Sequence, residues 1–199
     1  METINIALFN SINAGSGLGD IPLFLATLLA EYLIWLVPLL LIFIWFRDRT
    51  DSGRSRLFLA FFSAMLALGI NQLVGLFYQH PRPFMAGLGH TYLSHGADSS
   101  FPSDHVTVFC AVGLALCLDR TTRCFGAILG LAALPVAWAR IYLGVHFPLD
   151  MVGAFGTAFL SVVVTRLSAS PLEKLLCRPI LYLYKRSSPR LSPAKNRSR

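Results

Sequence analysis

Apolar segments close to the length of a membrane span recur five times along the chain. A helix needs about 20 mostly apolar residues to cross a bilayer core roughly 30 Å thick, where no water can satisfy an open backbone. The segments are residues 22–46, 57–78, 103–118, 124–143 and 148–167. This pattern predicts an all-α integral membrane protein built as a bundle of about five transmembrane helices.

The scarcity of charge supports a membrane protein, since 14% of the residues are charged against about 25% in soluble domains. We expect one membrane domain over residues 1–185. The segment 2–13 has the mixed apolar spacing of a short interfacial helix. The Pro-, Ser- and Arg-rich segment 186–199 is expected to be a disordered cytoplasmic tail.

The basic residues predict the orientation of the bundle. Fifteen of the 17 Lys and Arg residues lie in the linkers 47–56 and 119–123 or from Arg166 onward, all on one side of alternating spans. Cytoplasmic segments are enriched in Lys and Arg, so the N-terminus is expected outside and the C-terminus in the cytoplasm. Topology thus accounts for the net charge of +7, and we expect no nucleic-acid partner.

Alternation of the spans also brings distant polar residues together. Six polar side chains fall at the outer ends of the second to fifth spans: Arg82, Ser103, His105, Arg140, His146 and Asp150. Each of them alone has a structural explanation, as an interfacial anchor or a helix cap. Their joint placement on one side favours a shared function, because ionisable groups near lipid are costly.

The residue types in this group suit phosphate chemistry. Arginine presents a planar cationic fork that matches phosphate oxygens, and a helix start near Ser103 directs backbone N–H groups at an anion. Histidine can act as a nucleophile or as a proton donor. His146 and Asp150 are four residues apart, so the carboxylate can orient the imidazole as in a catalytic triad.

These motifs resemble those of the type 2 phosphatidic acid phosphatase superfamily, K-x6-RP, PSGH and SR-x5-H-x3-D. The chain has GLFYQHPRP from Gly75, PSDH from Pro102 and ARIYLGVHFPLD from Ala139. The short length, FPSDH and HPRPF are most similar to the bacterial undecaprenyl pyrophosphate phosphatase branch, which includes bacitracin-resistance proteins. The resemblance implies a phosphatidic-acid-phosphatase/haloperoxidase-like core and a reaction that needs no metal or other cofactor.

The resemblance also implies roles for individual residues. His146 would attack phosphorus and form a phosphohistidine, Asp150 would orient it, and His105 would protonate the leaving oxygen. Three further residues would hold the phosphate: Arg82, Ser103 and Arg140.

The chain departs from the family pattern at three positions. Gly75 stands at the lysine of the first motif, and Gln79 is the preferred substitute because we expect it to share a helical face with Asn71 and Arg82. Asp104 stands at the glycine of PSGH and is expected to turn toward an arginine or a helix end. Ala139 replaces the serine of the third motif.

Two other polar regions are further candidates. Glu31 lies inside the first span and could pair with the site or serve only as a hydrogen-bonded residue of the bundle. The Gly-rich segment 85–100 contains His90, His95 and Asp98 and could form a lid. These three residues do not have a recognised metal-binding spacing, so we expect no metal site.

The sequence therefore predicts a multi-pass phosphatase of a bacterial inner membrane. Its expected substrate is a polyprenyl pyrophosphate, converted on the outer face to the monophosphate, which would recycle the carrier lipid for the cell envelope and give bacitracin tolerance. Membrane lipid is the expected surrounding partner, and the oligomeric state stays open. The alternatives are a phosphatase of phosphatidylglycerophosphate or phosphatidic acid, a lipid A phosphotransferase, and a small transporter, although the polar residues cluster at one interface instead of mid-membrane.

Overall fold

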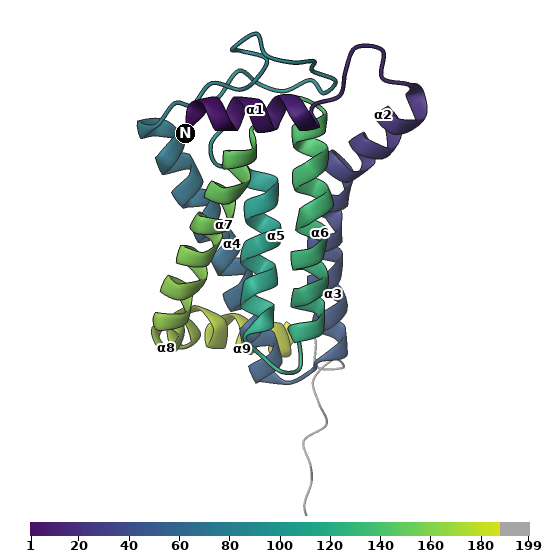
Figure 1. Ribbon diagram of the computed structural model, residues 1–199. Coiled ribbons are helices and arrows are strands. Elements are labelled where there is room, and N and C mark those ends of the chain that lie inside the picture. The colour runs from purple at the N-terminus through teal and green to yellow at the C-terminus, as the bar shows by residue number, and fades with distance from the viewer. Residues whose placement is uncertain (188–199) are drawn as a thin grey trace, which may run out of the picture.

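A computed structural model describes residues 1–187, and in this part of the chain every regular element is helical (Figure 1). Four helical stretches are long and apolar enough to span a membrane, and a fifth apolar helix is shorter. The five are Asp20–Arg47, Asp51–Phe77 (α4), Asp104–Cys117 (α5), Arg123–Tyr142 (α6) and Pro148–Leu167 (α7). The predicted all-α membrane bundle is confirmed, and the observed helices lie close to the predicted segments.

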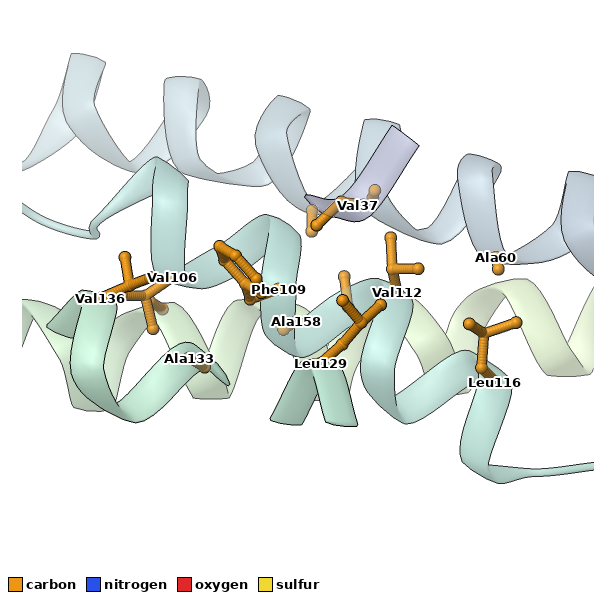
Figure 2. Close-up of a cluster of buried hydrophobic side chains, with 14 of the residues drawn as sticks. Val37, Ala60, Val106, Phe109, Val112, Leu116, Leu129, Ala133, Val136 and Ala158 are labelled. Atoms are coloured by element: carbon orange, nitrogen blue, oxygen red, sulfur yellow. The ribbon is translucent and has the colours of Figure 1, made fainter. Parts of the chain in front are cut away.

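The short helix α5 is the centre of the bundle and packs against α4, α6 and α7 (Figure 1). Small residues allow this close packing. A Cβ atom on Gly126 of α6 would lie 2.5 Å from the carbonyl oxygen of Gly113 in α5, so glycine is required there. Alanines and valines with a few larger side chains fill the core around Phe109, which is fully buried (Figure 2). Small residues at helix interfaces are typical of membrane bundles.

The first long helical stretch is interrupted in its middle. Helix α2 (Asp20–Thr27) is followed by a π-helical turn (Leu28–Tyr32) and a 3₁₀ turn (Leu33–Trp35) before α3 (Leu36–Arg47) begins. Such turns change the register of the backbone hydrogen bonds and can leave a carbonyl free for a side chain. The carbonyl of Ala30 within the π-helical turn accepts a hydrogen bond from the Arg140 side chain in this way.

The basic segments gather at one end of the bundle. Arg56 Nε, near the start of α4, lies 3.4 Å from an Asp119 carboxylate oxygen, so the start of α4 meets the α5–α6 linker. Three further elements follow α7 at this end, namely α8 (Ala169–Leu172), a π-helical turn (Glu173–Cys177) and α9 (Arg178–Ser187) (Figure 1). Lys185 of α9 pairs with Asp51 at the start of α4. The predicted tail lies outside the described residues from position 188 onward.

At the opposite end, α1 (Glu2–Ile12) lies across the ends of α6 and α7 (Figure 1). The predicted N-terminal helix is therefore present. Phe9 is fully buried and its ring lies 5.3 Å from that of Phe147, while the side-chain oxygen of Asn5 accepts a hydrogen bond from the Leu149 N–H in the first turn of α7. These contacts fix the start of α7, which carries part of the polar site.

Candidate active site

A cavity of about 530 Å³ opens at the end of the bundle that lies under α1. Its walls come from the end of α4, the segment after it and the start of α5, together with Arg140 and His146. Most of the polar residues predicted from the sequence line it: Gln79, Arg82, Asp104, His105, Arg140 and His146. Span alternation therefore did bring these distant residues into one place.

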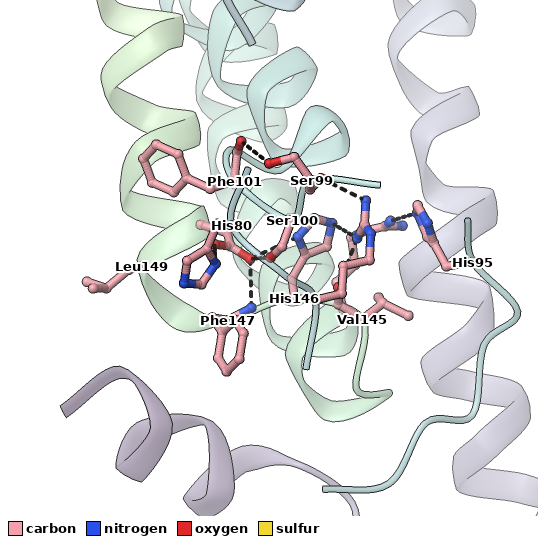
Figure 3. Close-up of polar contacts among 12 residues, drawn as sticks. His80, His95, Ser99, Ser100, Phe101, Val145, His146, Phe147 and Leu149 are labelled. Carbon is pink, nitrogen blue, oxygen red and sulfur yellow. Dashed lines mark hydrogen bonds and ion pairs between the residues drawn. The ribbon is translucent and has the colours of Figure 1, made fainter. Parts of the chain in front are cut away.

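His146 and Asp150 form a buried pair at the start of α7 (Figure 3). His146 Nδ1 lies 3.1 Å from Asp150 Oδ2, and the same oxygen accepts a hydrogen bond of 2.8 Å from the Phe147 N–H and another from the Ser100 hydroxyl. A carboxylate at Nδ1 favours the tautomer that carries its proton there. The other ring nitrogen, Nε2, is then unprotonated and able to act as a nucleophile.

The turn between α6 and α7 places His146. Gly144 has a φ of +81°, and a Cβ atom there would lie 2.2 Å from the His90 carbonyl oxygen, so only glycine fits. The Val145 N–H donates to the Arg140 carbonyl at 3.1 Å and closes the turn. Arg140, in the last turn of α6, and His146, in the turn before α7, thereby line the same cavity.

Arg82 lies against the nucleophilic side of His146. Its Nη1 is 3.3 Å from His146 Nε2 and donates at 2.9 Å to the Val145 carbonyl, while its Nε donates at 2.8 Å to Asp98. Burial, with the positive charges of Arg140 and Arg82, lowers the pKa of His146 well below its ordinary value. The imidazole is therefore neutral at pH 7, as a nucleophile requires.

Arg140 comes from the last turn of α6 and reaches two partners. Its Nη1 donates at 3.0 Å to the Ala30 carbonyl in the π-helical turn, and its Nη2 lies 3.2 Å from His95 Nε2. Its Nε and the hydroxyl of Ser103 are buried and have no hydrogen-bond partner among the described residues. Buried polar groups are rarely left without partners, so these two unsatisfied donors, one on an arginine that lines the cavity, fit an anion such as phosphate.

Comparison with known proteins agrees with this arrangement. Residues 56–172, more than half of the chain, match the model of the PAP2 superfamily. The chain belongs to the PAP2 superfamily. The matched region holds the cavity residues from α4 onward and all of α5, α6 and α7.

Curated relatives cover most of the chain. It is 39% identical over 154 residues to the putative undecaprenyl-diphosphatase YbjG of Escherichia coli K12, covering 77% of this chain and 76% of the relative. It is 33% identical over 157 residues to undecaprenyl-diphosphatase BcrC of Bacillus subtilis 168, covering 79% and 80%. The resemblance inferred from the motifs is thus confirmed at the level of the family.

Solved structures share the fold. The Aquifex aeolicus LpxE structure has a TM-score of 0.62 at 25% identity and covers 81% of this chain and 94% of that one. A transmembrane PAP2-type phosphatidylglycerolphosphate phosphatase from Bacillus subtilis has a TM-score of 0.62 at 19% identity, covering 87% and 88%. Together with the apolar helices, these neighbours identify a multi-pass membrane protein.

Two details of the sequence prediction are wrong. Helix α4 ends at Phe77, so Gln79 and Arg82 do not share a helical face with Asn71. The residue before a proline is restricted to extended conformations, and the prolines of HPRP stop the helix early. Asp104 does not turn to an arginine or a helix end, because its carboxylate accepts hydrogen bonds from the amides of Asn71 at 2.8 Å and Gln72 at 3.4 Å.

The remaining predicted residues differ in position. His105 is half-buried in the cavity wall, and Gln79 is exposed at its edge. Asp150 and Ser103 are buried next to the cavity, where the Ser103 N–H donates at 3.3 Å to the Asp150 carbonyl. Glu31 is exposed in the π-helical turn and does not line the cavity.

Four residues at the site were not predicted as site residues: His80, His95, Asp98 and Ser100. His80 Nδ1 lies 4.0 Å from Asp150 Oδ1, and Ser100 binds the other oxygen of that carboxylate. The sequence suggested only a lid for the segment with His95 and Asp98, because these contacts depend on how a long loop folds back over the bundle. Among residues 1–187, no cluster of three or more His, Cys, Asp or Glu side chains could hold a metal ion.

Proposed function

We propose that this PAP2 membrane phosphatase hydrolyses undecaprenyl pyrophosphate to undecaprenyl phosphate and inorganic phosphate. The two ring nitrogens of His146 carry the proposal, since Nδ1 is held by Asp150 at 3.1 Å while Nε2 faces Arg82 at 3.3 Å. Asp150 thus orients the imidazole ring, and Arg82 places a cation that can bind phosphate next to the attacking nitrogen. The substrate assignment is supported by the relatives named undecaprenyl-diphosphatase.

The proposed reaction proceeds in two steps. His146 Nε2 attacks the terminal phosphorus, and the bond from that phosphorus to the bridging oxygen breaks as His105 gives this oxygen a proton. Water then attacks the phosphohistidine and loses a proton to His105, while the nitrogen–phosphorus bond breaks and phosphate leaves. Arg82, Arg140 and Ser103 stabilise the charge that accumulates on the phosphoryl oxygens.

The test of the mechanism is phosphate release by the purified protein in detergent. His146→Gln keeps a polar side chain of similar size but removes the nucleophilic nitrogen, so we expect turnover to fall to background. His90→Gln is the matched control, because His90 is exposed and does not line the cavity. Undiminished turnover by His146→Gln would overturn the proposal.

The substrate is tested with undecaprenyl pyrophosphate, phosphatidylglycerophosphate and phosphatidic acid under the same conditions. We expect the highest kcat/KM for the pyrophosphate lipid, and a higher value for either other lipid would replace it as the substrate. Adding lipid A distinguishes hydrolysis from phosphotransfer, because a transferase would move the phosphate onto lipid A instead of releasing it. Expression in a bacitracin-sensitive strain should raise the inhibitory concentration of bacitracin, and His146→Gln should abolish that rise.

We further propose that the cavity faces outward in a bacterial inner membrane and that the C-terminus is cytoplasmic. The basic linkers at the opposite end of the bundle support this orientation. In a cysteine-free background, Gly87→Cys should react with a membrane-impermeant thiol reagent on intact cells, and Ser192→Cys should react only after lysis. The reverse pattern would invert the orientation.

A further inference from the structure

The site is short of positive charge for a pyrophosphate headgroup. A terminal phosphate carries roughly −1.5 to −2 at pH 7, and the inner phosphate of a pyrophosphate adds to it. The permanent cations that line the cavity are Arg82 and Arg140, and the Nε of Arg82 is already paired with Asp98 at 2.8 Å. Gly75, on the wall of the same cavity, supplies no charge.

His95 lies where a third cation would act. Its Nε2 is 3.2 Å from Arg140 Nη2, and its ring centroid is 6.2 Å from that of His146 (Figure 3). Its Nδ1 lies 3.8 Å from an Asp98 carboxylate oxygen and 3.4 Å from the Gly96 carbonyl. One nitrogen thus faces the phosphate-binding arginine while the other faces two acceptors, which is the environment of an imidazole that can gain a proton.

The charged groups around His95 determine when it is protonated. Arg82 approaches from the segment after α4, Arg140 from α6, His105 from the start of α5 and His146 from the turn before α7, while Asp98 is on the same loop as His95. Burial and the positive charges of Arg82 and Arg140 lower the pKa of His95 below its ordinary value of 6.5. A phosphate between His95 and Arg140 reverses this balance, since an anion favours the charged imidazole.

We propose that His95 is a substrate-binding residue that holds the inner phosphate of a pyrophosphate headgroup and takes up a proton as the substrate binds. In the free protein, neutral His95 accepts a hydrogen bond from Arg140. In the complex, both side chains donate to the anion. This inference rests on the proposed function, because it assigns a residue to the second phosphate of the substrate.

The experiment compares ligands with one and two phosphates. KM is measured for farnesyl pyrophosphate, and the inhibition constant is measured for farnesyl monophosphate, in the wild type and His95→Gln. Losing a charge-assisted hydrogen bond costs about 1.4 kcal/mol or more, a factor of about ten. We expect His95→Gln to raise KM at least about tenfold at pH 6, to raise the inhibition constant less than about threefold, and to leave kcat nearly unchanged.

The pH dependence separates this role from a structural one. Protonated His95 strengthens binding, so its contribution is present at low pH and is lost as pH rises through the pKa in the complex. The ratio of the KM of His95→Gln to that of the wild type should therefore fall from about ten at pH 6 toward one at pH 9. Ionisation of the substrate affects both proteins equally and cancels in this ratio.

Two further variants keep the result interpretable. His95→Lys restores a cation, so its KM should stay near that of the wild type at pH 6 and rise less with pH. Gly75→Lys added to His95→Gln should recover most of the lost affinity, because a Cβ atom on residue 75 meets Ser99 Cβ at an ordinary 3.5 Å.

His90→Gln is the control on the same loop and should match the wild type. Equal changes in KM and in the inhibition constant, or a KM ratio that does not vary with pH, would overturn the role of His95 without affecting the proposed function. Failure of the wild type to hydrolyse undecaprenyl pyrophosphate, or full activity of His146→Gln, would instead overturn the proposed function itself.

Discussion

Replacing Asp150 by asparagine separates the charge of this side chain from its geometry. Asp150 Oδ2 accepts from the Phe147 N–H at 2.8 Å and from the Ser100 hydroxyl, and it lies 3.1 Å from His146 Nδ1. A backbone N–H can only donate, so the asparagine must keep its carbonyl oxygen at this position. Its amide nitrogen then takes the place of Oδ1, which has no hydrogen-bond partner among the described residues.

The expected rate loss follows from the missing charge alone. Unit charges 3.1 Å apart attract by about 5 kcal/mol at an effective dielectric constant of about 20, which is an upper bound of about 10⁴ in rate. A hydrogen bond to a charged group exceeds a neutral one by about 1 kcal/mol, a lower bound of about fivefold. Between these bounds, we expect kcat for phosphate release to fall by roughly 10² to 10³.

Stability provides the second measurement. Asp150→Asn keeps all three contacts of Oδ2, so its thermal unfolding in detergent should stay close to that of the wild type. Asp150→Ala leaves the donors of Phe147 and Ser100 buried without an acceptor and should cost about 1–3 kcal/mol for each of them. Wild-type turnover by Asp150→Asn, or a loss of stability equal to that of Asp150→Ala, would refute this account of the carboxylate.

Two other predictions test the loop and the helix packing. Asp98→Asn removes a carboxylate that competes with phosphate for Arg82 Nε. Because the Asp98 side chain is 67% exposed to solvent, the ion pair is worth about 1 kcal/mol at most, so KM for the pyrophosphate lipid should fall by up to about fivefold. An increase in KM would show that Asp98 assists binding instead. Gly126→Ala would bring a methyl group within 2.5 Å of the Gly113 carbonyl and should lower stability by about 1–3 kcal/mol. Gly130→Ala, on the same helix with nothing within 4 Å, should not destabilise the protein, and equal losses in the two variants would contradict the close-packing argument.

The sequence predicted the helices well because the bilayer leaves few alternatives. A spanning segment must satisfy its backbone internally, so apolar length alone placed α4 to α7 close to their observed bounds. The pairing of His146 with Asp150 was predictable for a similar reason, since residues four apart at a helix start share a face. In both cases, the pattern of residues within one segment was enough for the prediction.

Other features depend on contacts between distant segments. No glycine or proline marks the π-helical turn Leu28–Tyr32, although its Ala30 carbonyl accepts a hydrogen bond from Arg140. The partners His95 and Asp98 lie in a segment without regular secondary structure, so no periodicity predicts where they point. Asp104 was misjudged because a carboxylate near phosphate suggested a cationic partner, whereas two amides from α4 were close enough to bind it.

The hydrogen bonds of the two arginines indicate that they act differently. An arginine has five N–H donors, and those of Arg82 reach Asp98, the Val145 carbonyl and the Ser99 carbonyl, in addition to its contact with His146. Arg82 is thus fixed by its surroundings and keeps a positive charge beside Nε2 of His146, the proposed nucleophile. Within residues 1–187, Arg140 Nε has no hydrogen-bond partner, and one of the two side-chain contacts of Arg140 is to a neutral imidazole on the loop. Because that contact is the more easily exchanged, we expect Arg140 to be the arginine that exchanges a protein contact, the one to His95, for an incoming phosphate.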